Sequence, residues 1–415
     1  MLYSRLATCF TSLLLGAHLT NGLSIPFRRE IPSVSKSISI RRRRSGADSV
    51  DQFNFTFLSQ GDNMAIYVGT IHLAGQSLDV QLDTGSSDLW IDTDGIDISQ
   101  FVDTSAETAI TYGDGTSAIG PILAGQVTFG NLAVDDQAFI SAPKSNATSL
   151  GDKGLLGIGP PSLSRIKDTL VGSDHNGKSF LDNVFSKHPE DPNFITFSLA
   201  RSPLGMADGG VFAIGEIPAE FSQIEKSTVL PVDSDAKHWI TSLDSVKINN
   251  VPMSGHGFRT KETALLDSGS SLAEGPRAYI DAMYGSIPGA AFDDNLATYR
   301  VPCDANVQME FVFGGASFPV HPIDATYAAG IDEDSNQVVC AGAFSVIEPN
   351  SEYDWLLGDS FLRNVFSLYE FGSWTSVADS PPHVKLLSVT DTSRANSEFE
   401  AMNAARLEQA RARGN

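Results

Sequence analysis

The sequence predicts an all-β fold made of two similar lobes with a few short helices, and three observations support this prediction. Between residues 50 and 390, short apolar runs are separated by Gly, Pro, Asp, Asn and Ser, which is typical of strands joined by turns. Helical periodicity is confined to 161–170, 179–187, 276–285 and a tail from about 394. An internal repeat indicates two units of related fold.

Several short runs are β-like, and in 78–82 apolar residues occupy every second place, so that one face of that strand can be buried. The clearest runs are 67–71, 78–82, 194–197, 211–214 and 309–313. Their shortness and spacing favour a β-rich protein over a helical one.

The repeat consists of a β-like run that ends in Asp-x-Gly-Ser-Ser and is followed later by two apolar residues and a glycine. It occurs at 83–87 with 154–157, and again at 267–271 with 355–358. The two aspartates, Asp83 and Asp267, are about one lobe apart in the sequence. Two lobes of similar fold would each place one aspartate at their shared boundary.

This arrangement predicts an N-terminal lobe over 45–215 and a C-terminal lobe over 216–390. Residues 391–415 form a tail rich in Ala, Arg, Glu and Ser. Its composition is compatible with a surface helix or with a frayed end.

The charge distribution separates a basic leader from an acidic body. The 415 residues carry a formal net charge of −22, yet residues 1–44 hold eight Lys or Arg and one Glu. The acidic body argues against nucleic acid or an anionic membrane as partner. A basic leader on such a body indicates a propeptide that is held electrostatically.

Processing signals occupy the N-terminus. Residues 1–22 read as a signal peptide, with Arg5 before a short apolar core. No stretch is long and apolar enough to span a bilayer, which takes about 20 residues. Arg41–Arg44 is expected to be a processing site rather than a nuclear signal or nucleic-acid patch. The expectation is a propeptide over 23–44, a mature chain from near Ser45, and secretion, with the vacuole as alternative destination.

The three cysteines and two sequons fit this route. Cys9 lies in the predicted signal peptide, which leaves Cys303 and Cys340 as one disulfide or as two free thiols. Asn54 and Asn146 head N-glycosylation sequons. The eight histidines show no metal-ligand spacing, and neither a metal nor a cofactor is expected.

The paired aspartates predict acid–base chemistry. Two carboxylates held close together cannot both ionise easily, so they share a proton over an acidic range of pH. Such a pair can deprotonate a water and protonate a carbonyl oxygen without a metal or covalent intermediate. The flanking residues suit this chemistry, because they include glycines that admit backbone amides, serines that reach the carboxylates, and hydroxyls that tie the two loops together. These are Gly85 and Gly269, Ser86 and Ser270, and Thr84 and Ser268 respectively.

These motifs resemble those of the pepsin-like aspartic proteases, in particular the secreted fungal type, over roughly residues 64–390. The segments 83–90 and 267–271 resemble the two active-site motifs, and 355–359 resembles the late apolar–Gly–Asp motif. The segment 111–116 resembles the flap hairpin: Tyr112 matches the tyrosine that closes over substrate, and Trp90 matches its hydrogen-bond partner.

The resemblance implies a bilobal pepsin-like acid protease fold with a cleft between the lobes. It implies a monomeric aspartic endopeptidase, made as a zymogen, that hydrolyses protein or peptide substrates at acidic pH. Cys303 and Cys340 sit where this family carries its second-lobe disulfide, and Lys36 is the one lysine in the propeptide that could pair with the aspartates.

The chain also departs from the family pattern. Between Trp90 and Tyr112 lie 21 residues, fewer than in mammalian enzymes, and none is cysteine. An acidic residue at the flap position of Asp114 accompanies acceptance of Lys beside the scissile bond in fungal relatives; the alternative is a turn residue beside Gly115. The rival function is a catalytically inactive pepsin-like protein that binds peptides or inhibits enzymes, and the intact motifs favour catalysis.

Overall fold

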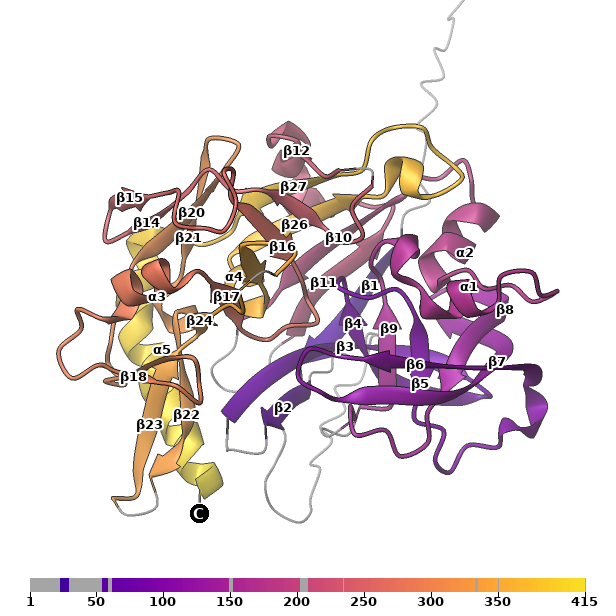
Figure 1. Cartoon of the computed structure of the whole chain (residues 1–415), viewed down its shortest axis with the longest axis horizontal. Coiled ribbons are helices and arrows are strands. Elements are labelled where there is room, and N and C mark those ends of the chain that lie inside the picture. Colours follow the sequence, from indigo (N-terminus) through magenta and orange to yellow (C-terminus); the bar gives the residue numbers. More distant parts are fainter. Residues whose placement is uncertain are drawn as a thin grey trace, which may run out of the picture.

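The computed structural model describes residues 23–29, 54–58, 62–148, 152–201, 208–233, 235–332, 335–349 and 351–414. Strands dominate, and the N-terminal and C-terminal halves form two lobes, indigo to magenta and orange to yellow in Figure 1. The predicted all-β bilobal class is confirmed. The lobe boundaries at 45–215 and 216–390 remain predictions.

The N-terminal half contains eleven described strands and four short helices. The strands are β1 (Leu23–Arg29), β2 (Asn54–Leu58), β3 (Asp62–Leu73), β4 (Gln76–Asp83), β5 (Leu89–Ile91), β6 (Val102–Thr111), β7 (Ser117–Phe129), β8 (Leu132–Ser141), β9 (Gly154–Gly157), β10 (Phe194–Leu199) and β11 (Asp208–Ile214). The helices are η1 (Ile98–Gln100), η2 (Pro161–Leu163), α1 (Arg165–Thr169) and α2 (Phe180–Lys187).

The C-terminal half also consists mainly of short strands. Its strands are β12 (Leu230–Pro231), β13 (Ile240–Ser242), β14 (Ser245–Ile248), β15 (Val251–Met253), β16 (Thr263–Leu266), β17 (Ala273–Gly275), β18 (Ala291–Asp293), β19 (Thr298–Val301), β20 (Met309–Phe313), β21 (Ala316–Val320), β22 (Thr326–Asp332), β23 (Gln337–Gly342), β24 (Phe344–Val346), β25 (Trp355–Leu357), β26 (Val365–Glu370) and β27 (His383–Ser388). Its helices are η3 (Ala219–Lys226), α3 (Arg277–Tyr284), η4 (Pro322–Asp324), α4 (Asp359–Leu362), η5 (Gly372–Trp374) and α5 (Thr392–Gly414).

A sheet with strands from both halves joins the lobes. Its order runs β12-β27-β26-β10-β11-β1-β3, so β26 and β27 return from the second half to pair beside β10. The segment Leu23–Arg29 forms β1, which is antiparallel to both β11 and β3. The first part of the predicted propeptide is therefore an interior strand of this sheet.

The sequence repeat corresponds to a repeated arrangement of strands. In the N-terminal lobe β4 is parallel to β9, β9 antiparallel to β5, and β5 parallel to β8. In the C-terminal lobe β16, β25, β17 and β24 repeat these three pairings in the same order. Leu82 pairs with Leu156, and Leu266 pairs with Leu357, at the same register in each lobe. The two aspartate loops therefore start from equivalent strand ends.

The tail forms a docked helix, which decides between the two possibilities that the sequence left open. Helix α5 lies along β22 and β23 in the yellow-to-orange part of Figure 1. It buries Phe399, and Arg406 donates to the Thr326 carbonyl oxygen at 2.6 Å. Among the described helices, none combines the length and apolar character needed to cross a membrane.

The predicted pairing of Cys303 with Cys340 is confirmed as a disulfide. It joins the segment after β19 to the buried end of β23. The loop that it closes spans 37 residues. Because a closed loop of this length limits the unfolded chain, the disulfide stabilises the second lobe by about 3–4 kcal/mol.

Candidate active site

Both predicted catalytic aspartates lie where an active-site strand ends. Asp83 is the last residue of β4, and Asp267 directly follows β16. Their side chains are buried, with 5% and 9% of each residue exposed. Because each strand is flanked in its sheet, the sheet fixes the direction in which each carboxylate leaves the backbone.

The glycine of each motif allows the two loops to approach one another. A Cβ at Gly85 would lie 2.5 Å from Oδ1 of Asp267, and a Cβ at Gly269 would lie 2.3 Å from Oδ1 of Asp83. Real Cβ atoms do not tolerate such distances, so any side chain here would push the opposite carboxylate away. Each loop therefore packs its backbone directly against the aspartate of the other lobe.

Each carboxylate accepts one backbone and one hydroxyl hydrogen bond from its own loop. The Gly85 amide donates to Oδ1 of Asp83 at 2.7 Å, and the Ser86 hydroxyl donates to Oδ2. In the second loop, the Gly269 amide donates to Oδ1 of Asp267 at 2.9 Å. Ser270 completes this set with a 2.7 Å bond to Oδ2. These bonds hold both carboxylates in nearly twofold-related positions.

Thr84 and Ser268 connect the two loops reciprocally. The Thr84 amide donates to the Ser268 hydroxyl at 3.1 Å, and the Ser268 amide donates to the Thr84 hydroxyl at 2.9 Å. Each hydroxyl then donates across the interface, Thr84 to the Leu266 carbonyl and Ser268 to the Leu82 carbonyl. Both residues are buried, so water cannot replace these bonds.

Electrostatics at the pair favour a retained proton. Burial, and then the neighbouring Asp267 charge, raise the pKa of Asp83 well above its usual range, although bonds from Ser86 and Gly85 oppose the shift. Removing both protons would leave two negative charges in contact in a poorly solvated site. One proton held between the two carboxyls relieves this repulsion, which is consistent with the raised pKa of Asp83.

The segment resembling a flap is the turn of the β6–β7 hairpin. The Gly115 amide donates to the Tyr112 carbonyl at 3.0 Å, and Gly115 has a φ of 83°, which favours glycine. Trp90 donates from its indole nitrogen to the Tyr112 hydroxyl at 2.6 Å. Burial, and then the charge of Asp83, raise the pKa of Tyr112, so its hydroxyl lies close to the pair and stays neutral.

Asp114 forms part of the flap turn. Its Oδ1 accepts from the Thr116 amide at 2.9 Å and from the Thr116 hydroxyl at 2.7 Å, and the side chain is exposed. This geometry supports the turn interpretation, because both hydrogen bonds to Oδ1 of Asp114 come from within the turn.

Four residues that the sequence analysis did not single out interact with the aspartate loops or their surroundings, through a hydrogen bond or through charge. Gln81 donates to the Gly269 carbonyl at 3.1 Å, which adds a bond between the lobes. The negative charge of Asp267 contributes to the pKa shifts of His238 and Tyr353, and the charge of Glu274 also raises the pKa of Tyr353. Glu274 could have been found from the repeat, since it lies as far after Asp267 as Trp90 lies after Asp83.

The remaining predicted sites lie apart from the aspartates. Asn146 is exposed, and its Oδ1 accepts from the Ser117 amide at 2.9 Å, while Asn54 lies in β2. Lys36 falls outside the described residues. Within the described part of the chain, no group of three or more His, Cys, Asp or Glu residues could hold a metal ion.

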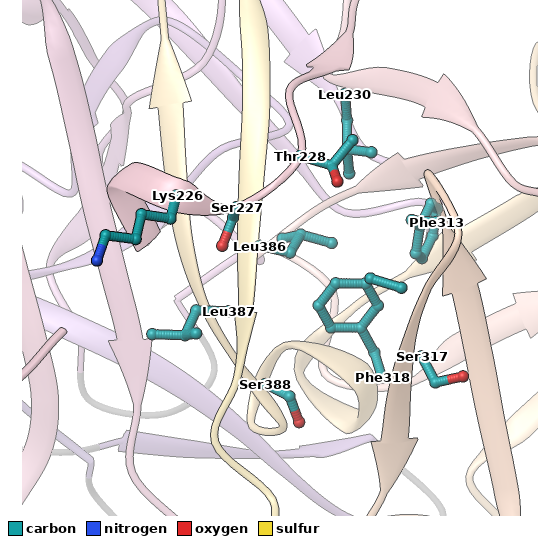
Figure 2. A pocket seen from close by; sticks show the side chains of 11 residues that line it. Lys226, Ser227, Thr228, Leu230, Phe313, Ser317, Phe318, Leu386, Leu387 and Ser388 are labelled. Atoms are coloured by element: carbon teal, nitrogen blue, oxygen red, sulfur yellow. The ribbon is translucent and has the colours of Figure 1, made fainter. Parts of the chain in front are cut away.

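A separate pocket of about 300 Å³ lies between η3, β12, β21 and β27 (Figure 2). Phe313, Phe318 and Leu386 supply much of its apolar lining, and Lys226 is its charged residue. No carboxylate lines this pocket.

Comparisons with known proteins agree with this geometry. The family model for eukaryotic aspartyl proteases matches residues 64–377. An aspartic protease of Phaffia rhodozyma is 28% identical over 336 residues, covering 76% of each chain. Aspergillopepsin-1 of Aspergillus oryzae is 25% identical over 321 residues, covering 73% of this chain and 74% of the relative.

The crystal structure of the aspartic proteinase from Irpex lacteus superposes with a TM-score of 0.62. It is 19% identical, and the match covers 80% of this chain and 96% of that chain, which supports the fold alone. Fold and motifs together define an aspartic-type endopeptidase, a hydrolase. The chain belongs to the eukaryotic aspartyl protease family.

The reciprocal bonds between the loops predict a large effect from a small substitution. Thr84→Val keeps the side-chain shape but leaves the Ser268 amide and the Leu266 carbonyl without their partner. We expect a loss of about 1–3 kcal/mol in the free energy of unfolding, measured by urea denaturation. Thr84→Ser retains the hydroxyl and should lose much less. Equal losses for Val and Ser would show that packing of the methyl group matters rather than these bonds.

Proposed function

We propose that this protein is a secreted aspartic endopeptidase in which Asp83 and Asp267 jointly activate a water at acidic pH. The observation that carries the proposal is the pair of buried carboxylates, each in contact with the glycine of the opposite loop. The family membership supports the reaction class. In this proposal the two aspartates supply both the acid and the base that the reaction needs.

In the proposed mechanism the pair holds one proton before substrate binds. The ionised carboxylate accepts a proton from the attacking water while the protonated carboxyl gives its proton to the scissile carbonyl oxygen. The resulting tetrahedral species then collapses as a proton passes to the leaving nitrogen. The Ser86 and Ser270 hydroxyls and both glycine amides hold the carboxylates in place throughout, so little reorganisation is needed.

The flap would cover an extended peptide bound between the lobes. Tyr112 is held by Trp90 and carries a neutral hydroxyl above the pair. Closure of this hairpin would exclude water and tighten the hydrogen bonds to substrate main chain.

A zymogen is also proposed. The basic leader and the acidic body attract each other, and β1 places the first part of residues 23–44 inside the central sheet. Cleavage after Arg44 would cut the covalent link between β1 and the rest of the chain. Secretion is supported by the predicted signal peptide and by the disulfide, which suits an oxidising compartment.

The rival function, a pepsin-like protein that binds without cutting, would not require this hydrogen bonding. A binding protein has no need to keep a proton between two buried carboxylates, which costs stability at neutral pH. Both motifs and the flap tyrosine are intact here, and this favours catalysis.

The catalytic proposal predicts that Asp83→Asn and Asp267→Asn each lower hydrolysis of denatured protein at about pH 4 by at least about 100-fold. The substitution keeps the side-chain shape but removes the shared proton. Hydrolysis by the wild type should also be blocked by pepstatin. Asp294→Asn, on an exposed turn, serves as the matched control and should retain full activity. A folded, processed wild type without hydrolysis would favour the binding-protein alternative.

The processing proposal predicts a mature N-terminus at or near Ser45. N-terminal sequencing of active protein from the culture medium measures it, and replacement of Arg41–Arg44 by alanines should leave the leader attached and activity low. Active protein that begins upstream of Arg41 would contradict the proposal. Activity found in cell fractions rather than in the medium would favour the vacuole.

A further inference from the structure

Glu274 occupies the position in the C-terminal lobe that Trp90 occupies in the N-terminal lobe. It pairs with Leu356 on antiparallel β25 and with Ser345 on parallel β24. Trp90 has the same kinds of neighbour on β9 and β8. Trp90 donates a hydrogen bond to the flap residue Tyr112. Glu274 therefore occupies, in the C-terminal lobe, the place equivalent to the surface of the N-terminal lobe that lies beneath the flap; we call these two surfaces the first wall and the second wall.

Strand alternation fixes the face on which the Glu274 side chain lies. Its neighbours in β17 face the core: Ala273 is fully buried, and a Cβ at Gly275 would lie 2.3 Å from the Trp355 ring. Successive side chains of a strand point to opposite faces, so the Glu274 carboxylate points away from that core. Its cross-strand partner Leu356 is also half-exposed on this outer face.

This face lies close to the aspartate pair. The pKa of Tyr353 is raised to about 12 by burial, then by the charges of Asp267 and Glu274. One phenol therefore lies within electrostatic reach of both carboxylates. In Figure 1, β17 and β24 lie on the side of the C-terminal lobe that faces the N-terminal lobe.

The equivalent faces of the two lobes differ in what covers them. In the N-terminal lobe, Trp90 is 1% exposed and packs with the hairpin residues Tyr112, Ala118 and Ile122. In the C-terminal lobe Glu274 remains partly exposed. The flap shields the first wall, and the second wall is left open to a bound chain.

Within the part of the chain that the structure describes, no cation balances the Glu274 carboxylate. Among the described residues, none donates a hydrogen bond to it or forms an ion pair with it. Arg277, three residues further on, instead pairs with Asp281 at 2.6 Å. The charge that acts on Glu274 is that of Glu348, which has the same sign. A half-buried carboxylate without a partner attracts a cation strongly.

We propose that Glu274 is a specificity-determining residue, which binds a Lys or Arg side chain of the substrate at one position close to the scissile bond. The inference rests on the proposed endopeptidase function and names a substrate class for the same site. A basic side chain on this wall supplies the partner that the carboxylate lacks. Glu348 strengthens the negative potential at the approach to this position.

The charge state of Glu274 gives a second readout. Burial, and then the charge of Glu348, raise its pKa above the usual range for a glutamate. Further titratable groups interact electrostatically in this region: Glu352, Tyr353, His238 and Asp267. Helix α4, which begins at Asp359, also contacts β17. A substrate lysine keeps its charge throughout the acidic range, so the preference should grow as pH rises and Glu274 ionises.

The test uses synthetic peptides that differ only by Lys or Met at each position within three residues of one cleaved bond. The processed wild type should cut the Lys peptide at least five-fold better at one position, as kcat/KM, and the preference should increase from pH 3 to pH 6. Glu274→Gln should abolish both the preference and its pH dependence while changing kcat/KM for the Met peptide less than about two-fold. Glu274→Lys should make a Glu peptide the better substrate at that position.

Controls separate this inference from other causes. Glu220→Gln, on exposed η3, removes one negative charge away from β17 and should leave the preference intact. Asp114→Ala tests whether the flap contributes at a different position. A wild type that cuts Lys and Met peptides equally, or a Glu274→Gln variant that keeps the preference, would overturn the inference. Failure to cut any peptide would contradict the proposed function instead.

Discussion

The structure depends on holding two carboxylates together that would otherwise repel each other. Thr84 and Ser268 exchange amide-to-hydroxyl hydrogen bonds across the interface and then donate to carbonyls of the opposite strand. Because all four bonds are buried, the loops cannot separate without leaving backbone groups unsatisfied. The absence of a side chain at Gly85 and Gly269 then lets each loop rest against the other aspartate.

The larger fold is arranged to deliver these loops to one place. Equivalent strand pairings end at equivalent points in the two lobes, and the central sheet joins the lobes behind them. The twofold relation does not extend to every side chain, since buried Trp90 beneath the flap in one lobe corresponds to partly exposed Glu274 in the other. The equivalent strand pairings hold the two carboxylates in the same way. The difference between Trp90 and Glu274 suits a site that binds a peptide, which has a direction.

Sequence patterns were sufficient for the fold class and for the helices within 161–170, 179–187, 276–285 and the tail, because these depend on local periodicity. The expectation that helical pattern is confined to these segments was wrong, since η1, η3, η4, α4 and η5 also form. The structure decides the disulfide, which the sequence had left open. The repeat also located both aspartate loops. Glu274 was not singled out among the 50 acidic residues, although the repeat places it as far after Asp267 as Trp90 lies after Asp83. Its meaning depends on which strands flank β17 and on the ring of Trp355 behind Gly275. The docking of α5 was equally undecided, because it depends on partners in β22 and β23 far away in the sequence.

If the aspartate pair holds one shared proton, the stability of the folded protein must depend on pH. Because the pKa of Asp83 is raised on folding, its contribution is fully present below the unfolded value of 3.8 and is lost as pH rises through the folded value. The measurement is the free energy of unfolding of the wild type and of Asp83→Asn across the acidic to neutral range. With a shared proton, the wild type should lose stability relative to Asp83→Asn as pH rises. Parallel curves for the two proteins would contradict it.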